Sequence, residues 1–308
     1  MSNTERFNPL DYPLAQKWPR LLTARSAWVP HTPFAMALVD LCRPDRIVEL
    51  GALHGDSYCS MCQAVQELQL PTRCTAVDTW QGDPHAGIYG PEVLRALREH
   101  HDPLYSGFST LLQMTFDEAV KQFDDGSIDL LHIDGFHTYE AVKHDYETWK
   151  PKLGPRGVVM FHDTQVRKPG FGVWKFWEEV SPQFPNFEFH HSFGLGILAV
   201  GQEAPPRLLS FLEIANREPD TVRAYFDHVG TAASTTRVAI NMLSNVQRLQ
   251  SMLNKRKQML GEPIVELDMR APLKFMEDVM LDVQAVVISD LRQRGFDVRT
   301  EPPPSQQQ

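Results

Sequence analysis

The sequence predicts an α/β protein with a doubly wound, mostly parallel sheet of seven strands. Short apolar segments alternate with helical segments between residues 46 and 203, as in strands joined by crossover helices. The last two apolar segments follow each other closely and are expected to close the sheet as an antiparallel pair. Acidic residues and histidines gather where the expected strands end. In such sheets ligands bind beyond the carboxyl ends of the strands.

Each expected strand is a short apolar or β-branched segment that ends at a turn-forming or polar residue. The expected strands are Arg46–Leu50, Cys74–Asp78, Phe108–Met114, Ile128–Asp134, Gly157–Asp163, Phe187–His191 and Leu195–Val200. The expected helices have apolar residues at helical spacing, and Thr115 with Glu118 forms a capping box. They are Phe34–Cys42, Ser57–Leu70, Pro91–His100, Thr115–Phe123, Thr138–Leu153 and Gly172–Val180.

The chain divides into four expected parts. Residues 1–45 form a Pro-rich N-terminal cover that ends in a helix, and residues 46–203 form the α/β domain. Residues 204–300 form a helical appendage, and residues 301–308 a disordered tail. The appendage contains a near-heptad series at Met242, Val246, Leu249, Leu253 and Leu260, interrupted by Arg256. This helix either packs on its own domain or mediates homo-oligomerisation.

Composition excludes several classes of protein. The 308 residues carry a net charge of −9 and no dense basic stripe, which disfavours nucleic acid as a partner. No apolar segment is long enough to span a bilayer, and the N-terminus lacks the layout of a secretory signal, so a cytoplasmic location is expected. Of the four cysteines, Cys59 and Cys62 form a C-x-x-C within an expected helix and are interpreted as buried packing thiols.

A glycine turn after the first strand predicts a nucleoside cofactor. The segment Glu49-x-Gly51-x-x-x-Gly55 permits close approach of backbone to a ligand, but it lacks the third glycine of a dinucleotide loop. An acidic residue before the first glycine suits a positively charged sulfonium group, and Asp78 can accept hydrogen bonds from both ribose hydroxyls. The predicted cofactor is therefore S-adenosylmethionine (SAM). The predicted cofactor-binding residues are Glu49, Gly51, Gly55, Ser57, Asp78, Thr79, Trp80 and Asp134. The alternative is a plain glycine turn with a helix-capping Asp78.

A second group of residues predicts the catalytic centre. Asp134 and His137 follow the fourth strand, and His162 and Asp163 end the fifth. Paired carboxylates hold Mg²⁺ through oxygen ligands, and such an ion lowers the pKa of an acceptor hydroxyl. The predicted metal ligands are Asp134, His162 and Asp163, and His137 is the predicted general base. The role of His162 is open, because it is either a ligand or a base.

Three of these assignments have plainer alternatives. His137 could be a polar residue at a helix N-terminus, and Asp163 a turn residue. His132 is interpreted as a satisfied core residue within its strand. Asp145 is either a supporting partner of the site or part of a solvated helix face, and the supporting role is favoured.

These motifs resemble a known family. The segment IDLLHIDGFHTYEAVKHDYETWKPKLGPRGVVMFHDT is similar to the class I SAM-dependent, Rossmann-like methyltransferases of the group called methyltransferase domain 24. That group is similar to the metal-dependent sugar O-methyltransferases of the macrocin and mycinamicin type. The resemblance implies Asp134 and Asp163 as ligands and His137 as base. His162 departs from it, since those enzymes carry a carboxylate there, although histidine suits softer divalent ions.

The resemblance covers residues 30–201 and makes residues 46–203 a SAM-binding methyltransferase domain. The segment DTWQGDPHAGIYG, residues 78–90, is similar to bacterial relatives in polysaccharide pathways, and its Trp80, Asp83, His85 and Tyr89 are expected to cover cofactor and substrate. The predicted reaction is SAM-dependent O-methylation of a sugar hydroxyl on a glycan or glycosylated metabolite.

Three other functions stay open from sequence. They are metal-independent methylation of another small molecule, NAD-dependent oxidation on a similar sheet, and a non-catalytic assembly role. The missing third glycine and the lack of a Tyr-x-x-x-Lys pair disfavour the oxidoreductase, and the acidic set at the strand ends disfavours a scaffold.

Overall fold

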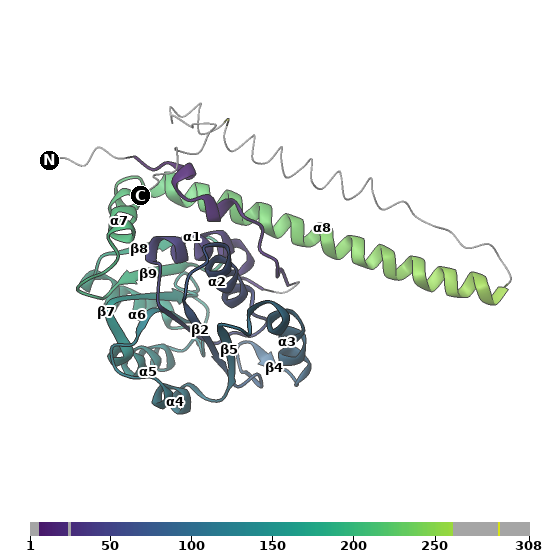
Figure 1. Cartoon of the computed structure of the whole chain (residues 1–308), viewed down its shortest axis with the longest axis horizontal. Helices are drawn as coiled ribbons and strands as arrows, with labels where there is room; N and C mark the ends of the chain where they lie inside the picture. Colours follow the sequence, from purple (N-terminus) through teal and green to yellow (C-terminus); the bar gives the residue numbers. More distant parts are fainter. Residues whose placement is uncertain (1–5, 24–25, 261–288, 290–308) are drawn as a thin grey trace.

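The computed structural model describes residues 6–23, 26–260 and 289 of the chain, and its sheet confirms the predicted fold class (Figure 1). Seven strands lie in the order β5-β2-β1-β6-β7-β9-β8. The first five are parallel, and β9 pairs antiparallel with both β7 and β8. The strands are β1 (Arg46–Leu50), β2 (Arg73–Asp78), β5 (Ser109–Gln113), β6 (Ile128–Ile133), β7 (Leu153–His162), β8 (Asn186–Phe189) and β9 (Leu195–Ala199).

The helices follow the expected order, with shifted ends. They are α1 (Thr32–Cys42), α2 (Asp56–Glu67), α3 (Glu92–Tyr105), α4 (Phe116–Ala119), α5 (Tyr139–Trp149), α6 (Val173–Val180), α7 (Pro206–Arg217) and α8 (Pro219–Leu260). Helix α5 ends at Trp149 instead of Leu153, and the 3₁₀ helix η5 (Lys150–Lys152), which contains Pro151, joins it to β7. The capping box of Thr115 and Glu118 is present at the start of α4.

Helices cover both faces of the sheet. Successive strand residues point to opposite faces, so Ile47 joins one hydrophobic cluster while Val48 joins the other. The first cluster contains α1, α2, α3 and the C-terminal helices, and the second contains α5 and α6. Helix packing on both faces buries the central strands, which explains why their sequences are mostly apolar.

The small hairpin after β2 and the three short 3₁₀ helices of the N-terminal segment were not predicted, and neither was η6 (Ser181–Gln183) after α6. The loop after β2 contains the strands β3 (Gly82–Asp83) and β4 (Gly87–Ile88), which pair antiparallel. The N-terminal segment contains η1 (Pro9–Asp11), η2 (Pro13–Gln16) and η3 (Val29–His31). Two-residue strands lack the length that a periodicity signal needs.

Helix α8 has two different halves. Its first turns pack in the core through Val222 and Phe226, which are fully buried. Its far end extends away from the domain, where Leu249, Leu253 and Leu260 are exposed (Figure 1). The side chains of Met242 and Val246 are not described, and residues 261–288 and 290–308, including the expected tail, lie outside the described residues. No described helix combines the length and apolar character needed to cross a bilayer.

Candidate active site

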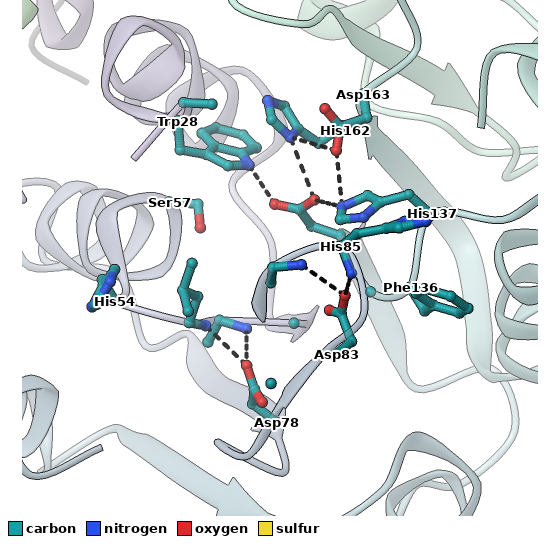
Figure 2. A pocket seen from close by; sticks show the side chains of 18 of the residues that line it. Trp28, His54, Ser57, Asp78, Asp83, His85, Phe136, His137, His162 and Asp163 are labelled. Atoms are coloured by element: carbon teal, nitrogen blue, oxygen red, sulfur yellow. Dashed lines mark hydrogen bonds and ion pairs between the residues drawn. The ribbon is translucent and has the colours of Figure 1, made fainter. Parts of the chain in front are cut away.

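A cavity of about 520 Å³ lies at the carboxyl ends of β1, β2, β6 and β7. It is the place where ligands bind in parallel α/β sheets. Most of the predicted site residues line it, namely Gly51, Gly55, Ser57, Asp78, Thr79, Asp134, His137, His162 and Asp163 (Figure 2). The strand order therefore brings together residues that lie more than a hundred positions apart in the chain.

The glycine turn after β1 is required by the neighbouring strand. Gly51 has a φ of +89°, and a Cβ atom added there would lie 2.0 Å from the carbonyl oxygen of Asp134. Its backbone N–H donates to the carbonyl of Val77, and the N–H of Asp134 donates to the carbonyl of Leu50. Only glycine fits between the ends of β1 and β6, and this close approach shapes the floor of the cavity.

Asp78 organises this turn with its own carboxylate. One oxygen accepts the backbone N–H groups of Ala52 and Leu53, each at 2.9 Å, and the other accepts the N–H of Trp80 at 2.7 Å. Burial raises the pKa of Asp78, and these backbone hydrogen bonds partly offset the rise. The carboxylate thus holds the glycine turn in place as well as lining the cavity.

Glu49 has different surroundings from those expected of a cofactor ligand. It is fully buried and is not among the described residues that line the cavity. Its Oε1 accepts the hydroxyl of Ser57 at 2.7 Å, and its Oε2 lies 2.9 Å from Nδ1 of His132. Burial raises its pKa, against the opposing effects of these two partners. The structure therefore places Glu49 behind the described lining of the cavity, and it gives His132 a defined polar partner.

Trp80 differs in the same way. It is 1% exposed, does not belong to the described cavity lining, and its indole N–H donates to the carbonyl of Leu53 at 2.9 Å. Trp80 therefore braces the turn from behind. In contrast, Asp83, His85 and Tyr89 of the same loop do line the cavity.

On the other side of the cavity, two carboxylates and two imidazoles face one another (Figure 2). His137 Nε2 lies 2.8 Å from Asp163 Oδ2 and 3.5 Å from Asp134 Oδ1. His162 Nδ1 lies 3.4 Å from Asp134 Oδ1 and 3.6 Å from Asp163 Oδ2. These four residues, Asp134, His137, His162 and Asp163, form the acidic–histidine cluster.

The charges of this cluster shift every pKa within it. Burial lowers the pKa of His137, but its bonds to Asp134 and Asp163 outweigh burial and raise it to about 10. Burial raises the pKa of Asp163, and the charge of His162 then brings it down to about 2. The pKa of Asp134 is likewise held well below its usual range. The two carboxylates thus retain their negative charges and require positive charge beside them.

The far nitrogen of His162 is held by a strained turn. Its Nε2 lies 3.2 Å from the carbonyl oxygen of Ser192, which also lies 3.2 Å from Nε2 of His31. Ser192 has a φ of +45° and Phe193 a φ of +73°, which is costly for residues other than glycine. Because Nε2 donates to a carbonyl, Nδ1 is the nitrogen that faces the carboxylates.

Trp28 is a site residue that the sequence motifs missed. Its indole N–H donates to Oδ2 of Asp134 at 2.9 Å, although the two residues are 106 positions apart. The indole ring also packs against His132 and His162, at centroid distances of 4.6 and 5.3 Å. The signal available in the sequence was one of two tryptophans in a Pro-rich segment, which says nothing about what it contacts.

The cluster fits a divalent cation. Ligand atoms of Asp134, His162 and Asp163 all lie within 4.8 Å of one another, and His162 presents a nitrogen whose partner nitrogen is already engaged. Metal-binding histidines commonly use this second hydrogen bond to fix the ring. Two carboxylates with one imidazole suit Mn²⁺ or a softer ion better than Mg²⁺.

Asp145 lies behind the cluster on α5. It is buried, and with Asp134, His137 and His162 it lines a small void between α5 and β6. Burial raises its pKa to about 7. This position excludes the solvated-face interpretation and is compatible with a supporting role.

Comparison with known proteins identifies the domain. Residues 48–164 match a family model described as a methyltransferase domain, the group that the motifs resemble. An uncharacterized protein, y4gI, of Sinorhizobium fredii (strain NBRC 101917 / NGR234) is 42% identical over 275 residues, which are 87% of this chain. The match covers only 30% of that relative.

Solved methyltransferases have a similar but distant arrangement. A putative O-methyltransferase from Klebsiella pneumoniae is 18% identical, with a TM-score of 0.44 and coverage of 65% of this chain and 93% of that one. The O-methyltransferase TomG from Streptomyces achromogenes, in complex with SAM, is 14% identical, with a TM-score of 0.43 and coverage of 65% and 100%. Likenesses of this extent do not bear on activity. The family match identifies residues 48–164 as a methyltransferase domain, the domain type that the motifs predict.

Proposed function

We propose that this protein is a SAM-dependent O-methyltransferase that acts on a sugar hydroxyl of a glycan or glycosylated metabolite. One observation carries the proposal: a glycine turn braced by Asp78 and the acidic–histidine cluster open into one cavity. The turn suits a nucleoside and the cluster suits a hydroxylated acceptor. Their shared cavity allows the transferred methyl group and the acceptor oxygen to be aligned.

In this proposal SAM binds over Gly51 and Gly55, with Ser57, Thr79 and Asp134 in the wall around it. The carboxylate of Asp78 already accepts three N–H groups and has about one lone pair left, so it can still accept a hydrogen bond from a ribose hydroxyl. Glu49 and Trp80 act indirectly. Glu49 holds Ser57 in place, and Trp80 holds the carbonyl of Leu53.

Asp134, His162 and Asp163 would hold a divalent ion, and these ligands match Mn²⁺ better than the Mg²⁺ that the sequence predicts. When bound, the ion would lower the pKa of an acceptor hydroxyl. The carboxylates of this chain would orient the acceptor, and His137 would remove the hydroxyl proton at Nε2, the atom that now faces Asp163. Positive charge supplied by the ion lessens the need for a protonated His137, which fits its role as base.

The acceptor side of the cavity has aromatic walls, which supports a ring-shaped acceptor. His85 stacks on Phe171 at 4.4 Å and packs against Phe136 at 4.6 Å, and all three line the cavity. Flat apolar faces pack against the C–H face of a sugar, while the carboxylates receive its hydroxyls. An acceptor that is an aromatic small molecule is the main alternative, and it would use the same walls.

A cytoplasmic location is part of the proposal. All four cysteines lie in described parts of the chain and are free, buried thiols, as is usual in a reducing compartment. Homo-oligomerisation through α8 is also proposed, because its far end exposes Leu249, Leu253 and Leu260 on one side.

Ligand binding followed by activity tests the proposal. S-adenosylhomocysteine (SAH) should raise the melting temperature, and NAD should leave it unchanged. SAH release from SAM is then measured with a panel of monosaccharide glycosides and of phenolic acceptors, with EDTA or Mn²⁺. Lack of any response to SAH would remove the methyltransferase proposal. Turnover that survives EDTA would reject only the metal-assisted part of the proposal. A preference for phenols would reject the sugar as acceptor.

A further inference from the structure

The two oxygens of Asp134 have different partners. Oδ2 accepts the indole N–H of Trp28 at 2.9 Å, while Oδ1 lies 3.4 Å from His162 Nδ1 and 3.5 Å from His137 Nε2. A carboxylate without such an anchor rotates and exchanges its oxygens. The indole donates one proton and accepts none, so it can hold Oδ2 without competing for a cation.

The segment that carries Trp28 is anchored on two sides. A Cβ atom added to Gly230 of α8 would lie 2.1 Å from the carbonyl oxygen of Pro30, so the helix lies directly against this segment. On the other side, the hydroxyl of Ser192 donates to the carbonyl of Ala27. Trp28 itself is 4% exposed. The indole N–H therefore has little freedom to move away from Asp134.

We propose that Trp28 is a positioning residue for the cation site: its N–H holds Oδ2 of Asp134, so that Oδ1 is presented together with His162 and Asp163. The inference rests on the proposed metal-assisted function and adds a residue outside the methyltransferase domain match. Partners that orient a metal ligand typically change metal affinity about tenfold to a hundredfold when removed.

The test is Trp28→Phe in the full chain, with Mn²⁺ and SAH titrated separately by calorimetry. The matched control is Trp149→Phe, because Trp149 is also fully buried but its indole N–H has no acceptor among the described residues. Trp28→Phe should raise the Kd for Mn²⁺ about tenfold or more and leave the Kd for SAH within about twofold. Trp149→Phe should change neither affinity.

A second variant tests the same positioning of Asp134 if Trp28→Phe does not fold. Ser192→Ala removes the bond to the carbonyl of Ala27 and keeps the Ser192 carbonyl that faces His162. It should raise the Kd for Mn²⁺ in the same direction by a smaller factor. Equal Mn²⁺ affinity in the wild type and both variants would overturn the proposal. A wild type that binds SAH but no Mn²⁺ would overturn it and leave the methyltransferase standing, whereas failure to bind SAH would count against the enzyme alone.

Discussion

The acidic residues on the two sides of the cavity have different partners. At the ends of β1 and β2, Ser57 donates to Glu49, which also lies 2.9 Å from Nδ1 of the buried His132, and three backbone N–H groups donate to Asp78. At the ends of β6 and β7, Asp134 and Asp163 face two imidazoles across distances of 2.8 to 3.6 Å. We call the first side, with Glu49 and Asp78, the framework side, because its carboxylates hold neighbouring groups of the protein in place. The second side, with Asp134 and Asp163, is the reactive side, because a bound ligand can rearrange its charges. The difference suggests that the first side binds the cofactor and that the second side carries out the chemistry.

The framework side should fail by steric change. Gly51→Ala places a methyl group 2.0 Å from the carbonyl oxygen of Asp134 in a residue with positive φ. We expect a loss of more than about 4 kcal/mol in the free energy of unfolding, from strain and displacement of β6. Urea denaturation measures it. Gly107→Ala is the control, since nothing lies within 4 Å of its added Cβ, and equal stability of the two variants would contradict this view of the turn.

A substitution on the reactive side should lower the rate of methyl transfer and leave the fold intact. Asp163→Asn removes one carboxylate that faces both His137 and His162. Methyl transfer, followed as SAH release with the best acceptor of the panel, should fall about 10³-fold, while SAH affinity stays near wild type. Asp125→Asn alters an exposed pair with Lys152 and should be silent. An active Asp163→Asn enzyme would remove the cluster from the mechanism.

Asp145, which lies behind the reactive side, should make the stability of the protein depend on pH. Its folded pKa, raised by burial to about 7, lies above the value of an unfolded aspartate. Stability from this group is therefore full below about pH 4 and is lost as pH rises through 7. Asp145→Asn should gain up to about 3 kcal/mol over the wild type at pH 8 and little at pH 4. Chemical denaturation at both values, with the exposed Asp124→Asn as control, measures this, and a gain independent of pH would refute the cause.

The smallest expected effect separates the two framework acids. Asp78→Asn weakens the charge-assisted bonds to the glycine turn within the cavity, so the Kd for SAH should rise about tenfold to a hundredfold, or about 2 kcal/mol. Glu49→Gln lies behind the lining and should have a smaller effect. Calorimetric titration with SAH compares them. A larger loss for Glu49→Gln would restore the direct cofactor contact that its position in the sequence first suggested.

The sheet was predictable because apolar periodicity and turn residues are local signals. They gave all seven strands of the main sheet, the capping box at Thr115, and the neighbouring ends of β1, β6 and β7. Helix α5 ends at Trp149, earlier than predicted, because the following residues, which include Pro151, form a 3₁₀ helix instead of a further α-helical turn. The two-residue strands β3 and β4 were missed because their pairing depends on backbone geometry that no periodicity records.

Site residues were predictable by type and less so by role. Glu49 and Trp80 occupy positions typical of cofactor contacts, yet one points to Ser57 and His132 and the other to the carbonyl of Leu53. The direction of a side chain at a strand end depends on which neighbour offers a hydrogen-bond partner. Such neighbours come from other strands, so local sequence does not reveal them.

By itself, the sequence determined the α/β class, the glycine turn, and the placing of Asp78, Asp134, His137, His162 and Asp163 at strand ends, since spacing and composition encode these locally. The tertiary structure alone decided that Trp28 reaches Asp134 across 106 positions and that Gly230 of α8 lies against Pro30. Contacts of this kind arise when remote segments pack on one core. Their partners are chosen by shape and hydrogen bonding in three dimensions, which a linear pattern does not carry.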